Sequence, residues 1–308
     1  MGLRIIRNSD PIVIDQLIFT IHSPPGIGKT SLGFTADSPI LLDFDSGAYR
    51  AENRGDSVPV RSWHEVESID PADLAGFKTI VIDTAGRALD MLTQKVIADD
   101  PRMGKGGQLS IQGFGKLKTS FTNWLSYIKS LRMDIVLLAH TEEKMRGEDV
   151  VDRLDVQGGS KNEIYKCSDV MARLSMKDGK RILNCNPSEF SYGKNPVGLD
   201  VMTVPNFADN AHFLGDVIRD VKKRINEQTE EQAQAAKFLA DWKARCDAAI
   251  TAKEFDAIRD DLLKETRSNY VKGVMSGALK DSSQAQGFAF DGAKKKFVSS
   301  PNPLTQTA

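Results

Sequence analysis

Four short and almost wholly apolar runs constrain the fold of this chain more strongly than any other feature. Strands that are buried on both faces of a parallel sheet have this composition. Segments compatible with a helix lie between them, notably residues 29–36 and 116–131. This alternation predicts an α/β fold, a mostly parallel sheet with helices on both faces. The four runs are residues 17–21, 40–43, 79–82 and 135–139.

Two further strand candidates differ from these four. Residues 170–174 and 181–184 are separated by a Lys-Asp-Gly-Lys turn at 177–180. A short turn of this composition between two β-prone runs favours a hairpin. We therefore expect an antiparallel pair at the edge of the sheet.

The composition changes after Pro205. Residues 208–280 contain no proline and no strand-like run. Two segments there, starting at Thr229 and Thr251, match the capping box that often begins a helix. Apolar side chains at helical spacing follow each box and predict a small helical hairpin. We expect a core at residues 1–205, an α-helical module at 206–280 and a flexible tail at 281–308.

Composition excludes several classes of protein. Lys+Arg 41 and Asp+Glu 42 leave a formal charge of −1, and 40% of residues are hydrophobic. This argues against wholesale disorder and against a surface that is basic throughout. The three cysteines lie far apart, which predicts neither disulfides nor a zinc site. No run is long enough to span a membrane, and we expect a cytoplasmic protein without a membrane partner.

The segment 23–30, SPPGIGKT, lies between the first expected strand and the first expected helix. A phosphate-binding loop needs this context, because its backbone N–H groups surround phosphates at the start of a helix. Lys29 is expected to reach the β- and γ-phosphates, and the Thr30 hydroxyl to bind Mg²⁺. Ser23 stands where the full motif has its first glycine. We predict ATP and Mg²⁺ as cofactors, with nucleotide-binding residues Pro25, Gly26, Ile27, Gly28, Lys29, Thr30 and Ser31.

Polar residues end three of the other expected strands. Asp83 follows one strand, where a P-loop ATPase holds Mg²⁺ through water, and Asp43 and Asp45 follow another. One of that pair could activate the attacking water, or both could simply cap the next turn. His140 ends the fourth strand, where it could sense the γ-phosphate or be structural. The candidate catalytic residues are Asp45, Lys29 and His140, and Asp83 and Thr30 are the candidate metal ligands.

The order of these parts resembles the RecA-like ATPase core over about residues 15–200. In that family a strand ending in Asp-x-acid supplies the catalytic base, which Asp45 matches, and Asp83-Thr84 matches the Walker B strand end. The polar strand tip matches His140, although the family usually has glutamine there. Two loops of RecA-like recombinases contact single-stranded DNA, and residues 101–115 and 141–166 match them.

The first of these loops has the composition that DNA binding requires. Residues 101–120 carry four basic residues and no acid, and Phe114 is available for stacking on a base. The alternative is a solvated loop with incidental lysines. The second loop has seven acids and five bases, which supports DNA contact poorly. The candidate DNA-binding residues are Arg102, Lys105, Phe114, Lys116 and Lys118.

Length, loop sequence and helical module together look most like phage-encoded RecA-like proteins for single-strand annealing and recombination, which would place the chain in the host cytoplasm. The resemblance implies a homo-oligomer, either a ring or a filament, in which Lys194 is the nearest candidate to reach a neighbour's nucleotide. An alternative is an ATPase switch or loader that recruits a replication or single-strand-binding protein through its C-terminal helices. A small-molecule kinase ranks last, because no Arg-rich lid segment is present.

Overall fold

The structure is a computed structural model that describes residues 3, 5–147, 149–157 and 159–300. Its residues form two compact units. One unit is Ile14–Ile225, and the other joins the described residues of Met1–Val13 to those of Asn226–Ala308.

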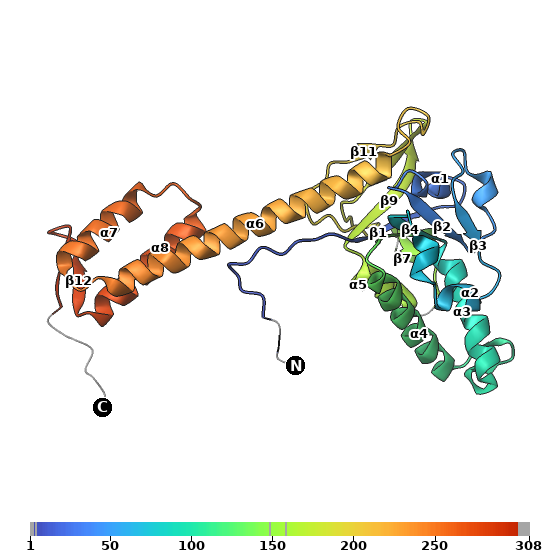
Figure 1. Cartoon of the computed structure of the whole chain (residues 1–308), viewed down its shortest axis with the longest axis horizontal. Helices are drawn as coiled ribbons and strands as arrows, with labels where there is room; N and C mark the ends of the chain where they lie inside the picture. Colours follow the sequence, from blue (N-terminus) through green and yellow to red (C-terminus); the bar gives the residue numbers. More distant parts are fainter. Residues whose placement is uncertain (1–2, 4, 148, 158, 301–308) are drawn as a thin grey trace. The chain divides into compact units, whose positions relative to one another are not determined.

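The first unit is built on a twisted sheet, which Figure 1 shows between layers of helices. Within the described residues it has nine strands, in the order β11-β10-β9-β1-β7-β4-β2-β3, with β8 paired to β7. The pairs from β9 to β3 are parallel, and β8, β10 and β11 are antiparallel to their neighbours. The mostly parallel sheet predicted above is confirmed. The strands are β1 (Ile18–Ser23), β2 (Pro39–Asp43), β3 (Ser57–Pro59), β4 (Thr79–Asp83), β7 (Asp134–Arg146), β8 (Asp149–Leu154), β9 (Val170–Lys177), β10 (Lys180–Asn184) and β11 (Met202–Thr203).

Successive strand residues point to opposite sides of the sheet. Because both sets are apolar here, both faces of the sheet are covered by helices. Ile80 and Ile82 pack in one apolar cluster with helix residues such as Phe121, whereas Val81 packs in a second cluster with Leu32. The first face carries α2 (His64–Glu67), α3 (Ala85–Asp99), α4 (Ile111–Ser130) and α5 (Ser160–Cys167). The second face carries α1 (Lys29–Gly33) and the first turns of α6 (Phe213–Ala248). Three 3-10 turns complete the unit: η1 (Ala48–Arg50), η2 (Pro71–Leu74) and η3 (Pro101–Met103).

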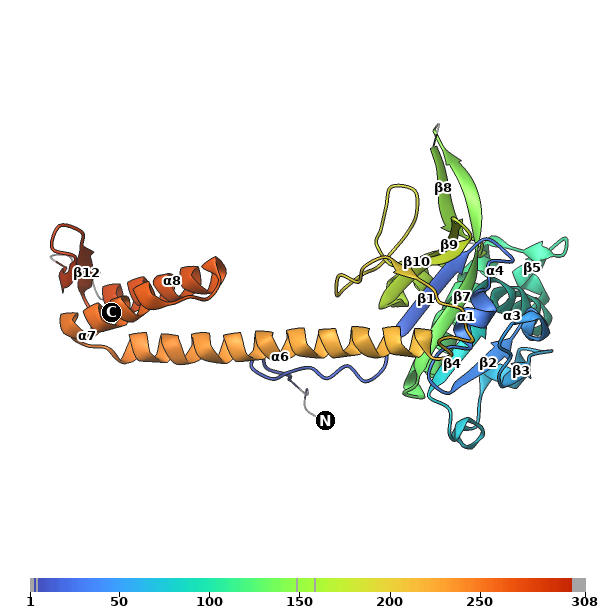
Figure 2. The ribbon, with the colours of Figure 1, turned by 90° about the horizontal axis from the view of Figure 1, so that it is seen from above.

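The two segments expected to be loops are more ordered than predicted. Residues 101–115 contain η3, a small hairpin of β5 (Gly104–Lys105) and β6 (Gln108–Leu109), and the first turn of α4. Residues 141–166 contain the end of β7, all of β8 and most of α5. Figure 2 shows the β7–β8 hairpin projecting past the ends of the other strands. The predicted β9–β10 hairpin is present, with its turn at Asp178 and Gly179. It is not at the edge of the sheet as expected, because β11 pairs with β10 and lies outside it.

The expected boundary at residue 206 differs from the observed one. Phe207, Leu214 and Val221 are buried in the second apolar cluster of the sheet unit. The start of α6 therefore belongs to the core, and the division between the units falls after Ile225. An amphipathic helix that must bury its first turns against the sheet cannot begin a separate module.

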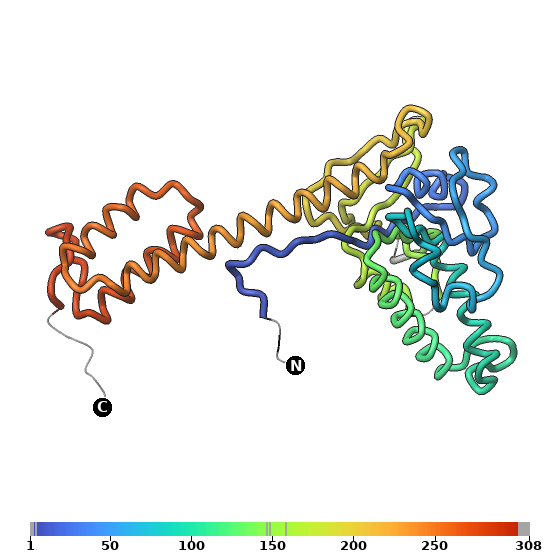
Figure 3. The backbone as a smooth tube through the Cα atoms, in the orientation of Figure 1, coloured from blue at the N-terminus to red at the C-terminus, as the bar shows by residue number. Residues whose placement is uncertain are grey.

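The second unit has its own apolar core. Figure 3 shows the C-terminal part of α6 grouped with α7 and α8. Trp242, Phe255, Met275 and Phe297 lie in this core. The capping box at Thr251 is confirmed, since its hydroxyl accepts from the backbone N–H of Glu254 and the Glu254 carboxylate accepts in return. The remaining elements are α7 (Ala252–Lys264), α8 (Asn269–Ala285), β12 (Phe288–Asp291) and β13 (Lys296–Ser299).

Two expectations for this region are wrong. Thr229 does not begin a helix, because α6 runs unbroken from Phe213 to Ala248. Residues 281–300 are not a flexible tail, because they end α8 and form the β12–β13 hairpin. Residues 301–308 lie outside the described residues. Nowhere in the described part of the chain does a helix combine the length and the apolar composition that a bilayer span requires.

Candidate nucleotide-binding site

Strand register gathers the predicted polar residues at one edge of the sheet. In the β1–β7 pair Ser23 lies opposite His140, and in the β2–β4 pair Asp43 lies opposite Asp83. The carboxyl ends of neighbouring parallel strands necessarily meet at the same edge, where open α/β sheets bind their ligands. Residues far apart in sequence are thus brought together by backbone pairing alone.

The loop between β1 and α1 has the backbone of a phosphate cradle. Gly26 and Gly28 have φ of 81° and 97°, in the left-handed region that favours glycine. Among the described residues, none accepts a hydrogen bond from the backbone N–H groups of residues 26–31. Consecutive N–H groups without acceptors at the start of a helix form an anion-binding site.

The ammonium of Lys29 is buried beneath this loop. It donates to the carbonyl oxygens of Ser23 and Pro24, each at 3.1 Å, and lies 3.2 Å from Nδ1 of His140. Burial lowers the pKa of Lys29 to about 8, although the carboxylates of Asp83 and Asp45 oppose this shift. Burial, reinforced by the Lys29 cation, also lowers the pKa of His140. A neutral imidazole can accept the hydrogen bond from Lys29.

Thr30 and Asp83 supply oxygen ligands of the kind that Mg²⁺ prefers. The Thr30 hydroxyl donates to the Asp83 carboxylate at 2.6 Å. Burial raises the pKa of Asp83 to about 6, and the Thr30 hydrogen bond opposes this rise. The neighbouring Thr84 hydroxyl is buried and has no partner among the described residues. An unsatisfied buried hydroxyl beside two oxygen ligands fits a site that binds Mg²⁺ and the polar atoms of a ligand.

Asp43 and Asp45 play different parts. The carboxylate of Asp43 accepts hydrogen bonds from the backbone N–H groups of Gly47 and Ala48, both at 3.0 Å. This is the capping role that the alternative interpretation assigned to such a residue. Asp45 instead faces the cavity, where two arginines hold its carboxylate. Their side chains are Arg50 and Arg87, each 3.3 Å from a carboxylate oxygen of Asp45.

These residues surround a cavity of about 730 Å³. It is lined by most of the predicted loop residues and by Asp45, Asp83 and His140. Five charged residues that the sequence reasoning missed also line it. No motif marks them, because they lie on a 3-10 turn and its exit, on a helix, in the loop after β8 and on strand β10. They are Arg50, Glu52, Arg87, Asp155 and Arg181.

The candidate DNA-binding residues do not form one basic patch. Arg102 is held by both carboxylate oxygens of Asp100, at 2.9 and 2.8 Å, and Lys118 pairs with Glu163 at 3.1 Å. Lys105, in the β5–β6 hairpin, and Lys116 have no ion-pair partner among the described residues. Phe114 is 43% exposed on α4.

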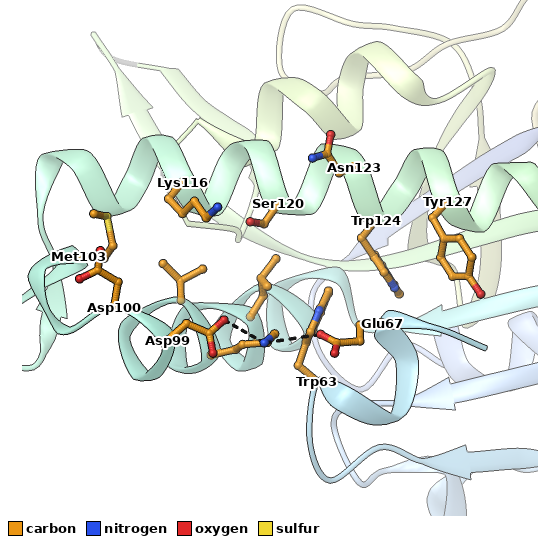
Figure 4. A pocket seen from close by; sticks show the side chains of 13 residues that line it. Trp63, Glu67, Asp99, Asp100, Met103, Lys116, Ser120, Asn123, Trp124 and Tyr127 are labelled. Atoms are coloured by element: carbon orange, nitrogen blue, oxygen red, sulfur yellow. Dashed lines mark hydrogen bonds and ion pairs between the residues drawn. The ribbon is translucent and has the colours of Figure 1, made fainter. Parts of the chain in front are cut away.

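Lys116 lines a second cavity of about 750 Å³, between α3 and α4. Figure 4 shows Lys116 on the α4 wall and Asp99 and Glu67 on the opposite wall. Lys95, which lines the same cavity, pairs with Asp99 at 2.9 Å and with Glu67 at 3.6 Å, so charges of both signs line the cleft around Lys116.

Lys194 is engaged with the core of its own chain. Its backbone pairs with that of Met171, and its ammonium donates to the carbonyl of Ser168 at 2.5 Å. It does not line the nucleotide cavity of its own chain.

Residues 15–197 match the protein family described as the AAA domain, which covers more than half of the chain. The chain belongs to this family of P-loop ATPase domains. The matched AAA domain contains every residue of the site described above and ends before α6. No curated protein is similar enough to the chain to count as a match.

Gly28→Ala tests whether the loop backbone forms the cradle. A side chain at φ 97° strains the backbone and turns the loop N–H groups, and its Cβ would lie 2.9 Å from the Arg181 guanidinium. We expect the Kd for ATP, measured by titration calorimetry, to rise at least about tenfold. Gly76→Ala is the matched control, since Gly76 has φ 92° and open space around it. Equal affinities in both variants would contradict the assignment.

Proposed function

We propose that the protein hydrolyses ATP in a Mg²⁺-dependent reaction at this AAA-domain site. The observation that carries the proposal is the convergence of Lys29, Thr30, Asp83, Asp45 and His140 around one cavity. Loop N–H groups without acceptors and a buried cation would bind the phosphates. The carboxylates at the ends of β2 and β4 and the imidazole of His140, within β7, lie where the reacting end of the nucleotide would lie.

The residues divide the work by their chemistry. Lys29 would exchange its bonds to loop carbonyls for bonds to phosphate oxygens, which bring charge to a buried cation. Thr30 and Asp83 would hold Mg²⁺, which when bound neutralises phosphate charge. Asp45 would orient the attacking water once Arg50 or Arg87 turns to the phosphates. His140 would report the γ-phosphate through its contact with Lys29.

We further propose that single-stranded DNA binds beside α4 and stimulates turnover, as annealing or strand exchange requires. Two lysines without ion-pair partners among the described residues, Lys105 and Lys116, support this, together with the exposed ring of Phe114. In a ring or filament of several copies, Lys194 would be the candidate to act on a neighbour's nucleotide.

A switch or loader is the second candidate. It is favoured by the second unit, which has a core of its own and an apolar groove of about 750 Å³. Leu239, Val271 and Val274 are among the residues that line this groove. An ATP turnover rate that does not change when DNA is added, together with binding of a replication protein, would support this candidate over the first.

Three substitutions separate binding from hydrolysis. Lys29→Ala should abolish ATP turnover, because no other cation is buried under the loop in the described part of the chain. Asp45→Asn should keep ATP affinity within about threefold and lower kcat at least about a hundredfold. Asp83→Asn should weaken Mg²⁺-dependent binding as well. Phosphate release and nucleotide titration measure the two quantities. Full turnover in Lys29→Ala would overturn the proposed site.

The pH dependence of kcat/KM should have two limbs. Below about pH 6 Asp83 becomes protonated and loses the charge that Mg²⁺ binding needs. Above about pH 8 Lys29 loses its proton and its attraction for phosphate. Activity should therefore rise through the first value and fall through the second, in buffers of constant ionic strength with Mg²⁺ at a fixed concentration that does not saturate the site. A profile that is flat across both values would contradict these assignments.

Stimulation by single-stranded DNA can be tested on α4 and its hairpin. The double variant Lys105→Ala/Lys116→Ala should lose most of the stimulation at low salt and keep the DNA-free rate. The salt slope of DNA binding should fall by about one unit for each phosphate contact that is lost. Arg102→Ala is the matched control with a smaller expected effect, because Asp100 already holds that guanidinium. Equal turnover with and without DNA would exclude this part of the proposal.

A further inference from the structure

Arg181, on β10 next to the outer strand β11, lies against the phosphate-binding loop. Its Nε donates to the carbonyl of Ile27 at 3.0 Å, and its guanidinium lies 5.1 Å from the ring centre of the buried Phe207. A Cβ on Gly28 would lie 2.9 Å from the same Nε. The guanidinium is therefore fixed beside the loop backbone whose N–H groups have no acceptors among the described residues.

Glu52 holds the guanidinium from the other side of the loop. Its carboxylate forms an ion pair with Arg181, and its backbone N–H donates to the Ser31 hydroxyl at 3.0 Å. Both side chains line the nucleotide cavity. The ion pair spans the loop and α1 from Ile27 to Ser31.

The pair is bonded to other atoms of the loop than the cluster of Lys29, Thr30 and Asp83. Among the described residues, no hydrogen bond or ion pair joins Arg181 or Glu52 to any of these three. In a phosphate-binding loop the lysine reaches the β- and γ-phosphates, whereas the backbone N–H groups surround the α- and β-phosphates. The Arg181–Glu52 pair, which contacts the loop at Ile27 and Ser31, is thus placed beside the α- and β-phosphates.

We propose that Arg181 binds the nucleotide in its own chain, and that Glu52 is the carboxylate which Arg181 exchanges for phosphate oxygens. This inference rests on the proposed nucleotide site. A guanidinium presents the same forked donors to a carboxylate and to a phosphate, so one can replace the other. In the structure the Arg181 guanidinium is paired with the Glu52 carboxylate. A phosphate group would compete with that carboxylate for the guanidinium.

The exchange should make the free energy of nucleotide binding less favourable. Nucleotide binding must break the Arg181–Glu52 ion pair and bring phosphates near the Glu52 charge. Both effects oppose binding, so Glu52 lowers the affinity that the loop and Arg181 alone would provide. Because the pair contacts the end of the loop that holds the α- and β-phosphates, ADP is affected as much as ATP. Glu52 thereby favours release of the product.

Nucleotide affinity of the full-length protein tests this exchange. Arg181→Ala should raise the Kd for both ADP and ATP about tenfold, and Arg181→Lys should raise it less. Glu52→Gln should instead lower both Kd values, by about two- to fivefold. In the double variant the gain from Glu52→Gln should shrink, because the competition for Arg181 is gone. Lys180→Ala is the matched control, an exposed cation on the adjacent position of β10, and should change neither Kd.

The opposite signs separate exchange from a structural ion pair. If the pair only stabilises the fold, both single variants would lower the unfolding temperature without ligand and both would weaken binding, and the proposal is then wrong. Weaker binding in Glu52→Gln alone would also overturn it, since it would mean that Glu52 itself binds the nucleoside. Loss of binding in Lys29→Ala with no effect of Arg181→Ala would refute the exchange and leave the proposed ATP site intact. Unchanged binding in Lys29→Ala would refute the site itself.

Discussion

The buried ammonium of Lys29 is the constraint on which the rest of the site depends. A cation under a loop is costly unless hydrogen-bonded partners surround it. The carbonyls of Ser23 and Pro24 and the imidazole of His140 provide those partners. Ser23 and Pro24 lie at and just after the end of β1, and His140 is the last residue of β7 that pairs with β1. The parallel register that pairs Ser23 with His140 therefore also places the partners of the lysine. The strand register, the loop backbone and the position of the Lys29 ammonium thus depend on one another. Phosphate oxygens could replace the loop carbonyls as partners of Lys29 without a change in the strands.

The part of the site that follows from backbone pairing could be predicted. Apolar runs identify β1, β4 and β7, and once these strands are parallel their carboxyl ends must meet, which places Lys29, Asp83 and His140 together. Arg87 and Arg181 could not be found in this way. One lies on α3 and the other on β10, and their roles depend on the partners Asp45 and Glu52, which tertiary packing selects.

The two capping-box patterns show that local sequence alone does not determine where a helix begins. Thr251 begins a helix because the chain before it has left α6, and its hydroxyl and Glu254 satisfy each other's backbone N–H groups. Thr229 has the same local pattern, but it lies inside a run that is already helical from Phe213. Its hydroxyl donates to the carbonyls of Asn226 and Ile12 instead. Burial of Leu214 and Val221 against the sheet starts the helix upstream, and propagation then costs less than a new start.

The net charge around residues 101–120 depends on their neighbours in the fold and not only on the sequence of the segment. Residues 101–120 hold four bases and no acid, yet Asp100 and Glu163 neutralise two of them from outside that segment. Lys116 faces Asp99 and Glu67 across the cleft between α3 and α4, although Lys95 already pairs with both carboxylates. Lys105 and Lys116 have no ion-pair partner among the described residues. The DNA binding that we propose for this surface would therefore rest on few phosphate contacts. Any selectivity for single strands then depends on a stacking surface, and the exposed ring of Phe114 provides one beside these lysines.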